Sequence, residues 1–207
     1  SRHYAMASKV MMLEPSDSEE AREFAKLAFE ISEKFDTPVL YKMCTRVAHS
    51  QSIIEGEERV VPEHKPYKKN ISKYVMAPAN AIRRHPFVEQ RMKDIEKWSE
   101  SSGINRIEKC SKAVVEPVET TLKNAISQEV VSTSSTTTMG IITSSTSYQY
   151  VKEVLGDSVN ILKLGMVNPL PADMIRKFAE RLEKLIVVEE LDPVIETFVR
   201  GLGLPAS

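Results

Sequence analysis

The sequence has little cysteine and no long apolar run. Its 207 residues include two cysteines, Cys44 and Cys110, which lie far apart and form no CxxC motif. Zinc sites and iron–sulfur clusters need more cysteine or histidine ligands at close spacing, so we expect this chain alone to build neither. No apolar run approaches the ~20 residues that span a bilayer, and no apolar segment near the start resembles a signal peptide. We therefore expect a cytoplasmic protein with reduced thiols and no membrane segment.

A strong net charge is also missing. The formal net charge is -1 at pH 7, whereas a general nucleic-acid binder usually carries a strongly basic surface. Hydrophobic residues make up 42% and charged residues 28% of the chain, which is ordinary for a globular protein and argues against disorder. The chain starts at Ser1 and ends in GLGLPAS, so we expect a piece of a longer polypeptide.

From Met139 to Glu196, short apolar runs alternate with amphipathic helices. The runs are GIIT (140–143), VNILKL (159–164) and LIVVEE (185–190). Such runs are typical of parallel strands that helices cover on both faces. No glycine-rich loop follows GIIT, so the closely spaced backbone N–H groups that bind a pyrophosphate are missing. This pattern predicts an α/β domain that docks to or completes a larger protein.

The N-terminal part predicts one more helix and one more strand. Ser16 and Glu19 have the spacing of a capping box, and apolar residues follow at helical spacing. The run PVLYKM (38–43) is then typical of a strand, and CTRVAHS (44–50) of the loop after it. Ligands of open α/β sheets meet the loops beyond the carboxyl ends of strands, so Arg46 becomes a candidate binding residue.

Residues 51–112 are rich in charge and proline, which indicates a long connection between domains. One helix is expected within it, opened by Pro86 and closed by Gly103. The basic bias of this segment suits a solvated arm over an acidic neighbouring surface or, alternatively, phosphate binding.

Residues 113–138 fit neither the connection nor the α/β pattern. Codons for VVEPVETT near their start can give VVSTGSTT when they are reverse-complemented and read one frame over, and this is one base from the VVSTSSTT found near their end. We expect a hairpin inserted in frame, which would form an exposed loop without function. Non-complementary ends in the gene would refute this.

Seven segments, in chain order, resemble the alpha subunit of indolepyruvate:ferredoxin oxidoreductase, a thiamine-diphosphate enzyme. They are SRHYA (1–5), LEPSDSEEA (13–21), DTPVLYKMCTRVAHSQ (36–51), APANAIRRHP (77–86), GIITSSTSYQYVKEVL (140–155), LKLGMVNPLP (162–171) and VVEELDPVIE (187–196). The resemblance covers nearly everything except 114–138. It implies an α/β chain in which residues 1–50 end a pyrimidine-binding domain, 51–112 form a linker, and 139–207 form a transketolase C-terminal-like domain.

The resemblance also implies an activity for the parent enzyme. That enzyme would oxidatively decarboxylate aryl pyruvates to acyl-coenzyme A and pass the electrons to ferredoxin. Thiamine diphosphate, magnesium and [4Fe-4S] clusters would be its cofactors, and a beta subunit, ferredoxin, coenzyme A and a 2-oxoacid its partners, in a hetero-oligomer. This chain has no GDG motif and no cysteine run, so we expect no cofactor, no metal and no catalytic residue in the fragment alone.

Three residues are candidates for substrate binding. An arginine can hold a substrate carboxylate with two parallel hydrogen bonds, which makes Arg46 the first candidate. SRHYA resembles a truncated active-site loop of transketolase, and this resemblance adds Arg2 and His3. The alternatives are a surface ion pair for Arg46 and a frayed terminus for the other two.

The acidic residues Glu189, Glu190 and Asp192 end the last predicted strand. They could form a paired-carboxylate site, but capping of the next helix at Pro193 is the stronger expectation.

Two other functions compete with the first. One is a non-catalytic α/β docking module. The other is a different thiamine-diphosphate-dependent 2-oxoacid oxidoreductase or a transketolase-like protein.

Overall fold

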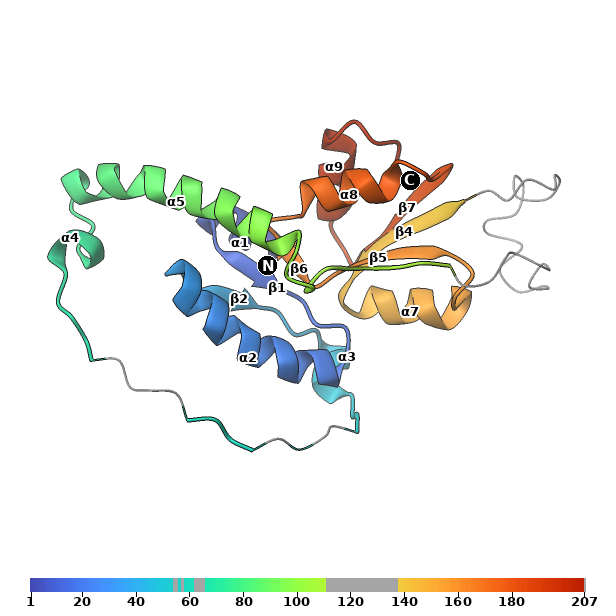
Figure 1. Cartoon of the computed structure of the whole chain (residues 1–207), viewed down its shortest axis with the longest axis horizontal. Coiled ribbons are helices and arrows are strands. Elements are labelled where there is room, and N and C mark those ends of the chain that lie inside the picture. Colours follow the sequence, from blue (N-terminus) through green and yellow to red (C-terminus); the bar gives the residue numbers. More distant parts are fainter. Residues whose placement is uncertain (54–55, 57, 62–65, 111–137, 207) are drawn as a thin grey trace.

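The chain forms two small sheets that lie side by side (Figure 1). The computed structural model describes residues 1–53, 56, 58–61, 66–110 and 138–206. The strand order is β2-β1-β6 in one sheet and β3-β5-β4-β7 in the other. The predicted insertion falls outside the described residues, apart from Thr138. No helix among the described residues is long and apolar enough to cross a membrane.

The four-stranded sheet confirms the predicted parallel α/β unit. Its parallel strands are β4 (Met139–Ser144), β5 (Asn160–Leu164) and β7 (Lys184–Val188), and the antiparallel edge strand is β3 (Arg106–Glu108). Helix α7 (Ser145–Leu155) lies on one face, and helices α8 (Ala172–Ala179) and α9 (Val194–Gly201) lie on the other (Figure 1). Along β4, Ile141 packs with residues of α7, whereas Ile142 packs with residues of α8 and α9. Both faces are thus covered, as the apolar runs predict.

The three-stranded sheet combines residues from both ends of the chain. Strands β1 (Met11–Leu13) and β2 (Val39–Tyr41) are parallel, and β6 (Met166–Asn168) runs antiparallel to β1. The other helices are α1 (Arg2–Ser8), α2 (Ser18–Phe35), α3 (Thr45–His49), α4 (Ile71–Tyr74) and α5 (Pro78–Ser99). Met11 and Leu13 of β1 pack in one cluster with apolar residues of α2 and α5.

A single residue separates the two sheets along the chain. Gly165 lies between β5 and β6, and its N–H donates to Asn105 Oδ1 over 3.0 Å. The N–H of Met166 donates to the same oxygen over 3.1 Å. A Cβ atom at Gly165 would lie 2.4 Å from the backbone oxygen of Ile104, so this close approach requires glycine.

A buried ion cluster also holds the two sheets together. Lys163 of β5 is fully buried, and its ammonium group contacts the Glu20 carboxylate at the start of α2. Arg106 of β3 donates to Glu20 over 2.6 Å. Burial alone would raise the pKa of Glu20, but Lys163, Arg106 and the N–H of Ser16 outweigh it and lower the pKa to about 2.

Three local expectations were wrong. Helix α5 begins at Pro78, so Pro86 lies inside it. The predicted loop 44–50 contains the short helix α3. The N-cap of α2 is Asp17, whose side chain accepts from the N–H of Glu20, so the capping pair is one residue later than predicted.

Candidate functional site

The carboxyl ends of strands from both sheets meet in one polar cluster, here called the strand-end cluster. Its members follow the strands directly: Glu14 after β1, Lys42 after β2, Ser144 at the end of β4, and Glu189 after β7. Ligands of open α/β sheets bind at this edge. The fold therefore makes the strand-end cluster the first candidate for a functional site.

Arg2 lies at the centre of the strand-end cluster. Its Nε and Nη2 atoms donate to the two Glu14 oxygens over 2.9 and 2.8 Å. Nη1 donates to Glu189 over 2.6 Å, and Nη2 also donates to Ser144 Oγ over 2.9 Å. All four side chains are buried or nearly so. Burial would raise the pKa of Glu14, but Arg2 and Lys42 outweigh it and lower that pKa.

Glu189 connects this cluster to helix α9. Its carboxylate accepts from the backbone N–H groups of Ile195 and Glu196, each over 3.0 Å. These are donors of the first helical turn, which have no partner within the helix. The expected capping role of the acidic strand end is confirmed, with Glu189 as the residue that performs it.

The other two predicted residues, His3 and Arg46, make different contacts. His3 is mostly exposed and lies 3.2 Å from Asp192. The guanidinium carbon of Arg46, on α3, is 5.5 Å from the centre of the Tyr150 ring on α7. Arg46 is exposed. A guanidinium above an aromatic ring can still direct donors to a ligand.

The structure therefore separates the three predicted residues. Arg2 begins a helix and is 6% exposed, so the alternative of a frayed terminus is wrong for it. Its donors are engaged by protein oxygens, which favours a structural role. Sequence reasoning missed Glu14 and Lys42. Ligands of open α/β sheets meet the residues just beyond the carboxyl ends of strands, which we call the strand-end rule. This rule finds Glu14 once Met11–Leu13 is recognised as a strand.

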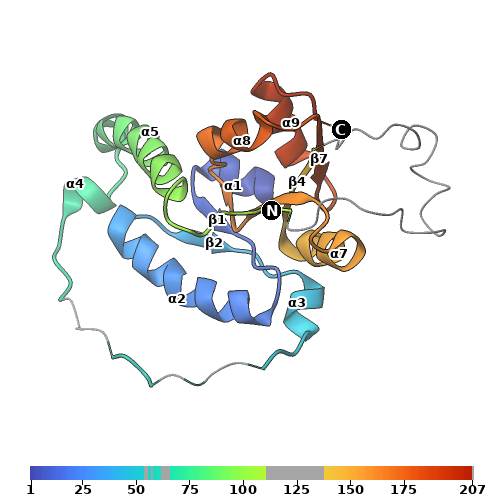
Figure 2. The ribbon, with the colours of Figure 1, turned by 45° about the vertical axis from the view of Figure 1, so that its right-hand side comes forward.

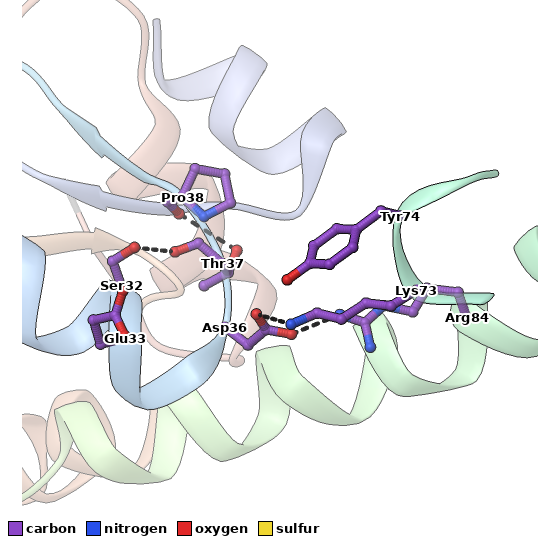
Figure 3. Close-up of a pocket in the computed structure, with 8 residues that line it drawn as sticks. All are labelled: Ser32, Glu33, Asp36, Thr37, Pro38, Lys73, Tyr74 and Arg84. Carbon is purple, nitrogen blue, oxygen red and sulfur yellow. Dashed lines mark hydrogen bonds and ion pairs between the residues drawn. The ribbon is translucent and has the colours of Figure 1, made fainter. Parts of the chain in front are cut away.

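A second polar site lies at the opposite, amino end of β2. This pocket of about 440 Å³ lies beside Asp36, the C-terminal cap of α2 (Figure 3). Lys73 and Arg84 ion-pair with the Asp36 carboxylate over 2.7 and 3.0 Å. The Lys73 hydrogen bond lowers the pKa of Asp36 most. Both cations thus bind the chain's own carboxylate, which fits an arm that docks on α2.

The described residues contain no group of three or more histidine, cysteine, aspartate or glutamate side chains that could hold a metal ion. The two cysteines of the sequence are also too few for a four-cysteine iron–sulfur cluster.

Comparisons with known proteins match almost the entire chain, although no family model matches it. The chain is 31% identical to indolepyruvate oxidoreductase subunit IorA of Archaeoglobus fulgidus, covering 98% of the chain and 29% of that subunit. The subunit of Methanothermobacter marburgensis is 35% identical, with coverages of 98% and 30%. That of Thermococcus kodakarensis is 34% identical, with coverages of 99% and 30%.

The fold is similar to that of a solved oxidoreductase structure. That enzyme is 2-oxoglutarate:ferredoxin oxidoreductase from Magnetococcus marinus, determined with 2-oxoglutarate, coenzyme A and succinyl-CoA. The TM-score is 0.51 at 14% identity, and the match covers 93% of this chain and 37% of that one. At this identity the match shows the fold alone. The chain thus spans about 30% of the length of the relatives it matches by sequence.

Proposed function

Because this chain is related over nearly its whole length to part of the indolepyruvate oxidoreductase subunit IorA, we propose that it is one segment of an indolepyruvate:ferredoxin oxidoreductase. The complete enzyme would decarboxylate an aryl pyruvate oxidatively, form the acyl-coenzyme A and reduce ferredoxin. The observation that carries this proposal is identity above 30% across 98% of the chain in relatives of one name.

Thiamine diphosphate, magnesium and [4Fe-4S] clusters belong to the proposal as cofactors of the complete enzyme. The sequence has two cysteines, too few for a four-cysteine cluster, and we propose that these groups are bound by the rest of the enzyme. A second subunit, ferredoxin and coenzyme A are the proposed partners, and the cytoplasm is the proposed location. By this proposal the 207-residue chain is inactive alone.

Arg46 is the residue of this chain that we propose binds substrate. It follows a strand at the edge where ligands enter, and it is exposed. The adjacent Tyr150 is 44% exposed, so the pair places a cation and an aromatic ring together at the surface. An aryl pyruvate carries a carboxylate and an aromatic ring, which match these two features. His3 stays a weaker proposal, since Asp192 is beside it.

The test is Arg46→Ala in the complete enzyme. A hydrogen bond to a charged group contributes about 1.5–3 kcal/mol, so kcat/KM for indolepyruvate should fall roughly 10- to 100-fold. The change should appear mainly in KM if Arg46 holds substrate and transition state equally. Arg46→Lys should recover part of the loss, because lysine keeps the charge without the planar fork.

Arg83→Ala provides the matched control, since Arg83 is also an exposed arginine on a helix but lies on α5. It should leave both kinetic constants unchanged. Unchanged KM and kcat in Arg46→Ala would remove Arg46 from the substrate site without affecting the proposal for the enzyme as a whole.

The docking-module alternative has one observation in its favour. The charged groups at the centre of the strand-end cluster bind each other, and Arg2 holds α1, β1, β4 and the start of α9 together through Glu14, Ser144 and Glu189. We therefore propose that most of this segment positions other parts of the enzyme.

A further inference from the structure

Residues 66–91, which contain α4 and the first part of α5, are strongly basic, and we call them the basic arm. Their six cationic side chains are Lys68, Lys69, Lys73, Arg83, Arg84 and Arg91. Glu89 is the one acidic residue in this range of the sequence, so with histidine neutral the basic arm carries a net charge of +5, whereas the whole chain carries -1. Charge of one sign gathered in so short a segment attracts a partner of the opposite charge.

Half of these cations attach the basic arm to helix α2. Lys73 and Arg84 pair with the Asp36 carboxylate over 2.7 and 3.0 Å, and Arg91 donates to the backbone oxygen of Asp36 over 2.7 Å. Asp36 ends α2, where the carbonyl groups of the last turn also favour cations. The arm is thus held in place by contacts within the chain, with its other cations on the outside.

The other three cations face solvent. Lys68, Lys69 and Arg83 are exposed, and none of them pairs with a carboxylate in the part of the chain that the structure describes. The arm's own carboxylate does not balance them, because Glu89 is bound by the ammonium group of Lys9. These three cations are therefore available to a partner.

Exposed aromatic and apolar side chains lie among the cations. Tyr67, Tyr74 and Ile82 are 79%, 56% and 74% exposed. The centres of the Tyr67 and Tyr74 rings are 6.2 Å apart, and the guanidinium carbon of Arg84 lies 4.0 Å from the centre of the Phe87 ring. Aromatic residues and arginine are enriched in protein–protein interfaces. Such a mixed surface fits a protein partner better than a free phosphate, which needs the charge alone.

The basic arm lies away from the residue that we propose binds substrate. In both views, α4 and the beginning of α5 are at the left of the molecule, whereas α3, which carries Arg46, and α7 lie to the right (Figures 1 and 2). A protein bound to the basic arm would therefore leave the strand-end edge open to the substrate.

We propose that the basic arm is a docking surface for the anionic face of ferredoxin. This inference rests on the proposed function, which makes ferredoxin the electron acceptor. The four cysteine thiolates of a [4Fe-4S] cluster outweigh the positive charge of its iron–sulfur core, so the cluster is anionic and suits a cationic surface. An electron carrier must also bind and leave in every turnover, and such encounters use small interfaces with electrostatic steering.

Steady-state kinetics of the complete enzyme, with ferredoxin as the acceptor, test the proposal. The double variant Lys68→Glu with Lys69→Glu should raise KM for ferredoxin about 10-fold at low ionic strength, because it reverses two charges that steer the encounter. Added salt should weaken the wild-type enzyme's interaction with ferredoxin more than the variant's. At saturating ferredoxin, kcat and KM for indolepyruvate should stay unchanged, since the basic arm lies away from Arg46.

The double variant Lys177→Glu with Lys184→Glu is the matched control. It makes the same change in net charge at exposed positions on α8 and β7, and it should leave KM for ferredoxin at the wild-type value. Methyl viologen replaces ferredoxin in a second assay, in which both double variants should match the wild type.

An unchanged KM for ferredoxin in the arm variant, or an equal rise in the two double variants, would overturn the proposal. So would a loss of viologen activity or of the second subunit in the arm variant, which would assign the basic arm to assembly of the enzyme. Turnover of indolepyruvate with viologen keeps these failures distinct from a failure of the proposed function, which would show as no turnover of any aryl pyruvate with either acceptor.

Carbodiimide cross-linking gives a measurement that does not depend on turnover. This reagent joins lysine amines to carboxylates that lie in contact with them. With ferredoxin present, mass spectrometry should find Lys68 or Lys69 linked to ferredoxin carboxylates. Links from these two lysines to the enzyme's own subunits alone would contradict the proposal.

Discussion

Replacing Glu20 by glutamine tests the buried cluster that holds the two sheets together. Glu20 is 14% exposed at its side chain, and it balances the fully buried Lys163. It also accepts from Arg106 of β3 and from the backbone of Ser16. Glutamine keeps the shape of the side chain but removes its charge, and a buried ammonium group then lacks its counter-charge.

The size of the effect follows from the pKa. Glu20 has a pKa of about 2 in the folded chain against 4.5 for an unperturbed glutamate side chain, and each unit corresponds to about 1.4 kcal/mol. The charged form therefore adds about 3 kcal/mol of stability at pH 7, with little loss to solvent screening at this burial. Because the folded pKa is depressed, this contribution is complete above pH 4.5 and disappears as the pH falls toward 2.

Urea unfolding followed by circular dichroism measures the difference. Glu20→Gln should lower the free energy of unfolding by about 3 kcal/mol at pH 7, and this difference should shrink steadily below pH 4.5. Glu19→Gln, at an exposed position of the same helical turn, should change stability by less than about 0.5 kcal/mol. A Glu20→Gln cost below about 1 kcal/mol, or one independent of pH, would refute the reasoning.

Two further changes test the packing around the sheets. Arg2→Ala should lower the free energy of unfolding in urea by about 3–5 kcal/mol, because it leaves the buried Glu14 without its bidentate partner. A decrease below about 1 kcal/mol would show that the Arg2–Glu14 pair contributes little to stability. Gly165→Ala should cost about 1–3 kcal/mol through its clash with the Ile104 oxygen, whereas Gly201→Ala has open space and should be neutral or stabilising in thermal melts. Equal melting temperatures for the two alanine variants would contradict the close approach at Gly165.

The sequence predicts the parallel sheet well because its signal is local. Each of β4, β5 and β7 is a β-branched or leucine-rich run between helices, and covering on both faces follows from that pattern. Strands β1 and β6 have three residues each, which is too short for a strand's alternation of apolar and polar residues to be recognised in the sequence. Their pairing joins residues more than 150 positions apart, and no local pattern specifies such a partner.

Reasoning from strand ends predicts only Arg46, and Arg2 becomes a candidate through the family resemblance alone. The strand-end rule identifies Arg46, because the strand before it is visible in the sequence. The central role of Arg2 depends on Glu14 and Glu189, which come from distant strands and meet only after folding. Proline favours the first turn of a helix, which predicts a start at Pro86, yet the helical run already begins at Pro78. Pro78 occupies the first turn as the rule requires, whereas Pro86 lies inside the helix, so the rule alone does not tell which proline begins it.

Ferredoxin reduction by the complete enzyme tests the central claim most directly. The enzyme would be supplied with indolepyruvate, coenzyme A and oxidised ferredoxin, and both reduced ferredoxin and acyl-coenzyme A would be measured. We predict that both products form together and that leaving out either indolepyruvate or coenzyme A abolishes them. An enzyme that reduces no ferredoxin with any aryl pyruvate would contradict the assignment of this chain to an indolepyruvate:ferredoxin oxidoreductase.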